Sequence, residues 1–590
     1  MIKHLFVILA LALASRPLLA QMDFSGEWTP RIHEDFAERI PGPDLGDYLG
    51  LPINAAARMR ADTWDASIQT LPEWQCRPHS SDYVWRGPSS VRISKEVDPV
   101  SRELIAFHVE SLRSDDRVIY MDGRPHPPEW AAHTWSGFST GKWDGKMLTI
   151  STTHLKEGYI RRNGLARSDR ATTAEHWIRH GDFMTVMTIV TDPVYLTEPF
   201  VRTTDFGLQP TQQLPPYPCD MVQEIKREKG LVPHHLPGTN LFLNEFAERA
   251  KLPPLVSRGG AATMYPEYRS KLSTPPQPNT DDAPRLAQRP VVVDDGQVHA
   301  LQVRGSIYML VGAGGNITVD AAPNGLVLLV DSGKAVMADK VLAALRQITP
   351  KPIHKIINTN VHPDHTGGNE KLVGSSSRTP RAEELGLDET AGTSIISHEN
   401  VLKRMAMPGT QDTVASSASW PTETYFVDEL RLSEKFNGEA IQVVHPPAAH
   451  SDGDSMVWFR RSDVIATGDV FVTDSFPLID LARGGSLQGI IDALNRILDI
   501  AMPASRVEGG TMIVPGHGRL CDTADVAFYR DMTTIFRDRI LSMIRKGMTL
   551  EQVKAARPTL DYDGLYGADS GNWTTDMFVE ASYRSLSAKK

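Results

Sequence analysis

Hydrophobic and polar positions divide the chain into two parts of different character. From about Asp23 to Phe200, short β-favouring runs such as RVIYMDGR, KMLTISTT and HWIRHGDFMTVMTIV alternate with turn signals. In the third run, Gly181-Asp182 stands where a hairpin would reverse. The pattern predicts an all-β domain at residues 21–250.

Residues 251–295 break this pattern. The stretch KLPPLVSRGG…STPPQPNTDDAPRLAQRP is rich in Pro, Gly and polar residues and has no periodic apolar positions to bury. We predict a linker here, and we expect limited proteolysis to cut within Leu252 to Pro290.

A different pattern begins at GSIYMLVGAGGNITVDAAPNGLVLLVDSG, which contains three apolar, β-branched runs. Asn324-Gly325 is a hairpin signal between the last two runs. The glycines at 312, 314 and 315 lack both G-x-G-x-x-G spacing and a following helix, so they indicate a tight turn rather than a phosphate loop. In ADKVLAALRQITPKP, Val341, Leu342 and Leu345 fall on one helical stripe, and the apolar strand HKIINTN follows.

The last hundred residues return to a helical period. One predicted helix has a continuous apolar face made of Met532, Ile535, Phe536, Ile540, Met543 and Ile544. We expect this helix to end at Gly547, and Thr549 to Gln552 form a capping box for the next helix. Residues 296–590 are therefore predicted to form an α/β domain whose C-terminal helices cover a sheet.

Length and composition agree with a two-domain globular protein. A chain of 590 residues is too long for one hydrophobic core, and 41% hydrophobic with 23% charged residues is ordinary for globular domains. The formal net charge of −10 argues against nucleic acid as a partner. The partner we expect instead is a small-molecule substrate, on the strength of the motifs considered below.

The first residues, MIKHLFVILALALASRPLLAQ, have the pattern of a secretory signal peptide at residues 1–20. No later segment is long and apolar enough to span a bilayer, so we expect an exported protein, periplasmic or secreted, with no integral membrane segment in the mature chain. Of the three cysteines, Cys76 and Cys219 either pair in an oxidising compartment, leaving Cys521 free, or stay as inert buried thiols.

The chemistry-bearing residues begin in NVHPDHTGG, with His362, Asp364 and His365. Imidazole nitrogens and carboxylate oxygens suit zinc, manganese or iron, and a loop that leaves a strand end can aim all three inward. The alternative is a capping loop in which Asp364 accepts backbone N–H bonds.

Three later segments favour the metal site. Each ends a predicted strand, or directly precedes one, with a metal-ligand residue: His450 in VVHPPAAHSDGDSMVWF, Asp469 in VIATGDVF and His517 in TMIVPGHGRL. Open α/β sheets gather their sites from distant sequence at such strand ends.

Together these motifs resemble those of the metallo-β-lactamase fold superfamily, whose signature is H-x-H-x-D-H, a later histidine, an aspartate after glycine and a final histidine. The resemblance covers about residues 298–590 and implies an αββα sandwich: two mixed sheets face to face, helices outside and metals at one edge. It implies that His362 and His450 hold a first metal and that Asp469 bridges to a second. The implied ligands of the second metal are Asp364, His365 and His517. Asp364 would also be the catalytic residue that orients a water molecule shared by the metals.

Asn360 departs from this signature, because most of the superfamily has histidine there. An amide oxygen is a weak zinc ligand, so we expect one tight Zn²⁺ site and a weaker first site, with Mn or Fe as alternatives. The predicted function is metal-dependent hydrolysis of an ester, thioester, lactone or amide, β-lactams included. A mononuclear iron dioxygenase of the same fold and a non-catalytic binding protein remain open.

Two regions are left without an assigned role. YMDGRPHPPEW followed by WSGFSTGKWDGKMLTISTT resembles a β-rich, lipocalin-like domain of bacterial exported proteins, which implies no activity; His126 and His133 are interpreted there as surface or packing residues. His445 is interpreted mainly as structural, with support of the metal ligands as the alternative. The polar insertion between Gly374 and Ser394 either shapes substrate access or is a spectator loop.

Overall fold

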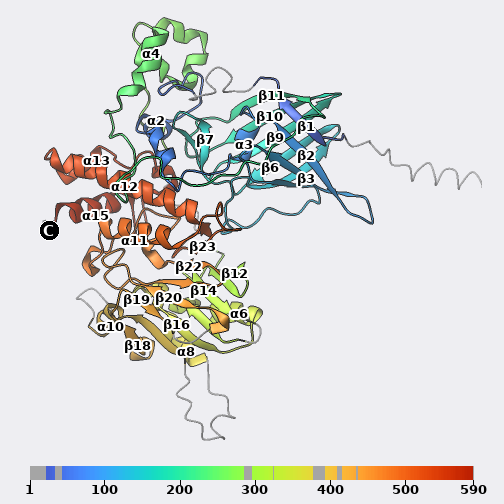
Figure 1. The fold of residues 1–590 in the computed structure, drawn as a ribbon. Coiled ribbons are helices and arrows are strands. Elements are labelled where there is room, and N and C mark those ends of the chain that lie inside the picture. The colour runs from blue at the N-terminus through green and yellow to red at the C-terminus, as the bar shows by residue number, and fades with distance from the viewer. Residues whose placement is uncertain are drawn as a thin grey trace, which may run out of the picture.

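The computed structural model describes residues 22–32, 43–284, 295–322, 325–375, 393–407, 415–432 and 436–588 (Figure 1). The N-terminal part contains a closed barrel in the order β1-β11-β10-β9-β6-β5-β4-β3-β2. Its strands are β1 (Gly26–Pro30), β2 (Val91–Val97), β3 (Leu104–Ser111), β4 (Arg117–Tyr120), β5 (Phe138–Asp144), β6 (Met147–Thr153), β9 (Thr172–His180), β10 (Phe183–Thr191) and β11 (Phe200–Leu208). The predicted β-rich domain is confirmed, whereas its lipocalin-like character stays a prediction. The signal-peptide prediction for residues 1–20 and most of the 374–394 insertion lie outside the described residues.

Side chains fill the barrel. Trp28, Trp85 and Trp177 are fully buried, and Trp85 meets Trp177 edge to face with ring centroids 4.9 Å apart. A buried ion pair also crosses the interior, with Arg117 Nη2 2.8 Å from Glu175 Oε1. The barrel interior is thus a packed core that contains one charge pair.

The strand pairing confirms the predicted hairpin. β9 and β10 pair antiparallel with His180 opposite Phe183, and Gly181 takes φ +64° at the reversal. Neighbouring barrel strands are antiparallel except β4 and β5, which are parallel.

Smaller elements surround the barrel and continue the chain to residue 284. They are α2 (Ala55–Asp62), η1 (Ala66–Thr70), α3 (Ser81–Val84), β7 (Gly158–Arg161), β8 (Leu165–Arg167), η2 (Leu241–Asn244), α4 (Glu245–Ala250), α5 (Pro254–Ser257), η3 (Gly260–Met264) and η4 (Pro266–Lys271). The described part of the predicted linker packs on the N-terminal region: the Tyr48 amide donates to Ser257 O at 2.9 Å, and the Ala55 amide donates to Asp282 Oδ1 at 2.6 Å. We retain residues 251–295 as the proposed boundary between the domains.

The C-terminal part is an αββα sandwich, as the sequence predicts. The first sheet contains β12 (His299–Arg304), β13 (Ile307–Val311), β14 (Ile317–Ala321), β15 (Val327–Val330), β16 (Ile353–Ile357), β17 (Ser394–His398) and β18 (Glu423–Tyr425). The second contains β19 (Glu429–Arg431), β20 (Ile441–Val444), β21 (Met456–Phe459), β22 (Val464–Ala466), β23 (Met512–Val514) and β24 (Cys521–Asp522). Both sheets mix parallel and antiparallel pairs.

Alternation along the strands builds the layers. Leu328 on β15 belongs to the core between the sheets, with Val457 of the second sheet, whereas Leu329 belongs to the cluster beneath the outer helices. The outer helices of the first sheet are α6 (Ala338–Ile348) and α8 (Asn369–Ser375), followed by α10 (Glu399–Ala406). Val341 and Leu345 of α6 are buried, as the predicted stripe requires, whereas Leu342 is only partly buried at its edge.

Helices from the end of the chain cover the second sheet. They are α11 (Leu487–Ile500), α12 (Thr523–Arg545), α13 (Leu550–Ala555), α14 (Asp563–Tyr566) and α15 (Thr575–Ser587). Met532, Phe536 and Ile540 on α12 are fully buried, as their spacing predicts. The predicted capping box is present, since Thr549 and Gln552 cap each other's backbone at the start of α13.

The same helices also face the N-terminal region (Figure 1). One hydrophobic cluster joins Tyr195 and Leu196 to Phe536 and Tyr562. Tyr195 Oη donates to Asp561 O at 3.1 Å, and buried Arg539 pairs with Asp561 at 2.7 Å. The two parts of the chain therefore share an apolar core.

Cys76 and Cys219 form a disulfide, and Cys521 is free and buried. Of the two alternatives left open by the sequence, pairing is therefore the correct one. Within the described residues, no helix combines the length and apolarity needed to cross a bilayer.

Candidate metal centre

The predicted ligands come from loops at the C-terminal ends of strands. His362 and the short helix α7 (Pro363–Thr366) follow β16, and His450 follows β20. Asp469 lies on η8 (Gly468–Val470) directly after β22, and His517 follows β23. Since these strand ends meet at one edge of the sandwich, segments more than 150 residues apart (362 to 517) converge there.

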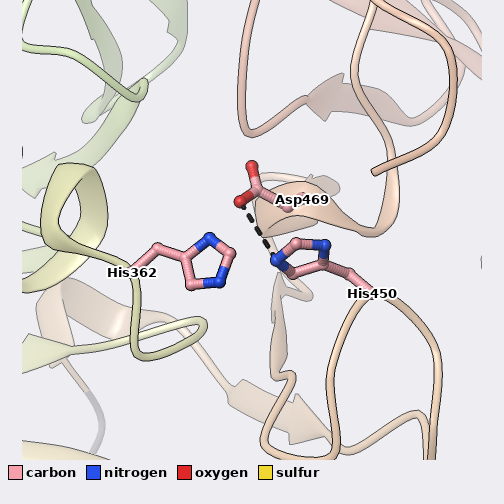
Figure 2. A group of neighbouring side chains, drawn as sticks. All are labelled: His362, His450 and Asp469. Carbon is pink, nitrogen blue, oxygen red and sulfur yellow. Dashed lines mark ion pairs between the residues drawn. The ribbon is translucent and has the colours of Figure 1, made fainter. Parts of the chain in front are cut away.

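Side-chain donor atoms meet in two groups. His362, His450 and Asp469 form one, and Asp364, His365 and His517 form the other, with the donor atoms of each group within 4.8 Å of one another. In Figure 2, His362 and His450 approach from opposite sides beneath the Asp469 carboxylate. These are the six residues that the sequence predicts.

Asp469 lies between the groups. Its Oδ2 is 3.1 Å from His365 Nε2 and 3.6 Å from His450 Nε2, while its Oδ1 is 3.3 Å from His517 Nε2. One carboxylate therefore touches histidines of both groups, which is the arrangement expected of a bridging ligand.

The donor set fits a cation. Within the described parts of the chain, His365 Nε2, His450 Nε2 and Asp469 Oδ1 are buried and have no hydrogen-bond partner. Buried polar atoms without partners are costly, and imidazole and carboxylate are the donors that zinc, manganese and iron prefer. A metal ion between these atoms would satisfy all three.

The opposite nitrogen of each of three histidines is fixed by a second partner. His365 Nδ1 lies 2.7 Å from Asp331 Oδ2, and His450 Nδ1 lies 2.9 Å from Leu478 O. Because a carboxylate or carbonyl accepts, Nδ1 carries a proton in both rings, so Nε2 is the atom left for a ligand, where a metal ion would take the place of any second proton. His362 is held the other way round, by Nε2 at 2.9 Å from Asp480 Oδ2, so Nδ1 is its available atom.

Asp480 is a residue of the candidate site that the sequence analysis missed. It also pairs with Arg483 at 2.6 Å, and its two partners lower its pKa against the opposing effect of burial. No motif spacing links Asp480 to the other residues, so the sequence offers no signal for it.

Asn360 is fully buried and uses both ends of its amide. Nδ2 donates to Asp469 Oδ2 at 3.2 Å, and Oδ1 accepts from the His362 backbone N–H at 2.8 Å. Asn360 therefore holds the loop to the Asp469 carboxylate.

Carboxylates dominate the electrostatics. Burial opposes the charged forms of His365 and His517, but Asp469 and other carboxylates outweigh it, raising the pKa of His365 well above its ordinary value and that of His517 to about 9. Burial likewise opposes the Asp469 carboxylate, yet His365 and His517 hold its pKa well below the usual range. The cluster strongly favours positive charge among its donors.

Two glycines allow the loops to approach. A Cβ on Gly516 would lie 2.4 Å from Asp469 Oδ1, and one on Gly315 would lie 3.0 Å from His365 Cε1. The predicted glycine turn near 312–315 therefore lies against the candidate donor cluster at Gly315.

The other histidines considered earlier lie outside both donor groups. His445 Nδ1 bonds to Asp454 O at 2.7 Å, and its ring stacks on His398 with centroids 3.8 Å apart. His126 bonds to Thr153 and Thr140 of the barrel, and His133 bonds to Leu155 O. Packing roles account for these contacts.

Comparison with known proteins agrees with this geometry. Residues 305–517 match the family model described as the Metallo-beta-lactamase superfamily. A linear primary-alkylsulfatase of Pseudomonas sp. (strain ATCC 19151) is 26% identical over 263 residues, which cover 39% of this chain and 48% of that protein. The chain thus spans about half the length of the curated relative it matches.

Two solved structures show likeness at lower identity. The stereoselective inverting sec-alkylsulfatase Pisa1 from Pseudomonas sp. is 17% identical with a TM-score of 0.35, covering 49% of this chain and 50% of that one. A metallo-beta-lactamase from Pontibacter korlensis is 14% identical with a TM-score of 0.30, covering 40% of this chain and 99% of that one.

Proposed function

Because residues 305–517 form a domain of the metallo-beta-lactamase superfamily, we propose that the protein is a metal-dependent hydrolase whose centre is built on Asp469. The observation that carries the proposal is the contact of this carboxylate with His365, His450 and His517 while two of those imidazoles keep a buried, unpartnered Nε2. Such an arrangement suits two neighbouring cations, with zinc as the first choice and manganese or iron as alternatives.

Metal ions bound here would supply Lewis-acid chemistry, lowering the pKa of water and polarising the bond to be cleaved. The chain's own residues do the rest. Asp331, Asp480 and Leu478 O fix the rings of His365, His362 and His450. Asp364 has a partly exposed carboxylate 3.5 Å from His517 Nε2, so it can orient a water molecule and hold its proton.

The substrate class we propose is an ester, with sulfate esters of alkyl chains the first to test. The support is the similarity to a linear primary-alkylsulfatase. Carboxylic esters, thioesters, lactones and amides, including β-lactams, are the other members of the panel, since the fold alone does not select among them.

The test uses the purified full chain. Turnover of each substrate class is measured as isolated, after chelation, and after addition of zinc, manganese or iron. We expect hydrolysis of an ester that is lost on chelation and restored by metal. Dioxygen consumption restored by iron alone would replace the hydrolase with the iron dioxygenase, and no turnover with any metal would favour the binding protein.

Export to the periplasm or outside the cell is a further part of the proposal. The disulfide between Cys76 and Cys219 supports it, because such bonds persist in oxidising compartments, and the signal-peptide pattern of residues 1–20 agrees. Fractionation of cells that express the full chain tests it, with the protein expected outside the cytoplasm.

A further inference from the structure

A cavity lies between the N-terminal region and the C-terminal helices, and none of the six residues of the candidate metal centre line it. Its volume is about 170 Å³. Its walls come from the η1 region and the barrel's loops on one side and from Asp531, Ile535 and Tyr562 on the other. Exposed Gln69 also lines it, so the cavity reaches the surface there.

Arg77 is the central polar residue of this cavity. Its guanidinium stacks on Trp74, 3.8 Å from the ring centroid, and lies 5.7 Å from that of Trp135. Nε donates to Glu73 O at 2.8 Å, but Nη2 is buried and, within the described ranges, has no hydrogen-bond partner. A buried N–H without an acceptor is costly, so this atom calls for one.

Five arginines and four acids line the cavity. Asp65 accepts from the Ser67 amide at the start of η1, and Arg161 pairs with Asp47 outside the cavity. Of the acids in the wall, Asp531 pairs with Arg530 and Asp561 pairs with Arg539, both of which lie outside the cavity. Arg60 and Glu157, which both line the cavity, pair with each other at 3.0 Å.

Arg77 and Arg113 are the two wall arginines considered next, because they lack an ion-pair partner in the described part of the chain. In the part of the chain that the structure describes, neither has a carboxylate within ion-pair distance, although both line the cavity. Arg113 Nε donates to Arg77 O at 3.1 Å, which holds the two residues together. Asp531, Glu157 and Glu73 act on the Arg77 charge only from beyond ion-pair distance, so the buried Nη2 of Arg77 is left to bind an anion.

The walls also select the body of the ligand. Trp64, Trp74 and Trp135 all line the cavity, and a planar apolar group would stack on such rings. An engineered apolar cavity of about 150 Å³ binds benzene, so a volume of this size admits a single ring.

We propose that this cavity binds a small aromatic carboxylate, with the carboxylate on the Arg77 Nη2 donor and the ring against the tryptophans. The planar fork of arginine matches the two oxygens of a carboxylate. The site is separate from the metal centre, and its existence does not depend on the hydrolase activity.

The test uses 4-bromobenzoate and the metal-loaded full chain. Crystals soaked in the probe are searched for the anomalous signal of bromine, which we expect in the cavity beside Trp135. Calorimetric titration should show Arg77→Gln weakening binding about 10–100-fold, the loss that one charge-assisted hydrogen bond implies. Arg506→Gln, at an exposed arginine that does not line the cavity, should leave binding unchanged.

Three results would overturn the proposal: bromine found only at the metal centre or not at all, equal affinity for neutral 4-bromobenzyl alcohol, or unchanged affinity in Arg77→Gln. Inorganic sulfate that competes at the probe's own affinity would also reject it, because the ring would then contribute nothing. If Arg77→Gln fails to fold, the bromine position in the unmodified protein decides.

Discussion

Asn360 donates a hydrogen bond to Asp469, the carboxylate that touches histidines of both donor groups, over 3.2 Å between Nδ2 and Oδ2. The Asn360 carbonyl oxygen is already taken by the His362 amide at 2.8 Å. Because both ends of the amide are already hydrogen-bonded, we expect Asn360 to position the Asp469 carboxylate rather than to add a ligand to the first group.

We therefore predict unequal metal sites in the unmodified protein, the first weaker by about tenfold or more. Asn360→His would place an imidazole beside His362 and His450, so metal titration by calorimetry should move toward two equivalent ions. Asn279→His adds an imidazole at an exposed position and should change nothing. Two equally tight ions in the unmodified protein would refute this prediction.

His517→Ala should abolish the tight site and nearly all turnover. His517 is the histidine that contacts both Asp364 and Asp469, at 3.5 and 3.3 Å, and no neighbour can replace it. Elemental analysis after dialysis, with turnover measured on the same sample, checks both losses. His180→Ala removes an exposed barrel histidine as the control, and full metal content in His517→Ala would exclude His517 as a ligand.

Asp480→Ala should weaken metal binding at the first group about 10–100-fold, which is typical for partners that orient a ligand. The substitution releases His362 Nε2, so the ring loses its fixed orientation. Competition with a chromogenic chelator measures the affinity. Asp499→Ala removes a carboxylate that pairs with exposed Lys229 and is the matched control; equal affinities in the two variants would mean that Asp480 plays no part.

The disulfide should contribute substantially to stability. It closes a loop with a sequence separation of 143 residues, and cross-links of such loops typically stabilise by about 2–4 kcal/mol. The double variant Cys76→Ser/Cys219→Ser should unfold at lower denaturant concentration than the oxidised protein and should be insensitive to reductant. Cys521→Ser should keep the reductant response; losing it would place the effect at Cys521 instead.

Cleavage within Leu252 to Pro290 should nick the chain without separating its parts. Tyr195, Arg539 and Tyr562 lie in the contact between them, where apolar burial and the Arg539–Asp561 pair hold both sides. Gel filtration of the nicked protein should give one species of full mass, and denaturant should release two fragments. Fragments that elute apart without denaturant would show that the shared core is too weak to hold them.

Local patterns made much of this fold predictable. The stripe on α12, the capping box at Thr549 and the reversal at Gly181 follow from rules that act over a few residues. The six residues of the candidate metal centre could also be predicted from the sequence, because each stands next to a strand and the fold brings strand ends together. His362, Asp364 and His365 further share one short motif.

The hydrogen-bond partners of these residues could not be predicted from the sequence. Asp480 meets His362 through a loop with no pattern of its own, and the bonds of Asn360 depend on the orientation of one amide. The parallel β4 and β5 pair, which helps close the barrel, is set by tertiary packing and not by local alternation. Contacts of this kind depend on distances across the whole fold, which a single sequence does not encode in any local signal.

The hydrogen bond between Tyr195 and Asp561 can form only late in translation. Its two residues are 366 positions apart, and at about 5–20 residues per second a ribosome needs about 20–70 s to pass from one to the other. During that time the apolar face around Tyr195 and Leu196 has no helices to cover it. We therefore expect the nascent chain to expose this apolar surface for tens of seconds and to be prone to aggregation, or to need a chaperone, until its last helices emerge.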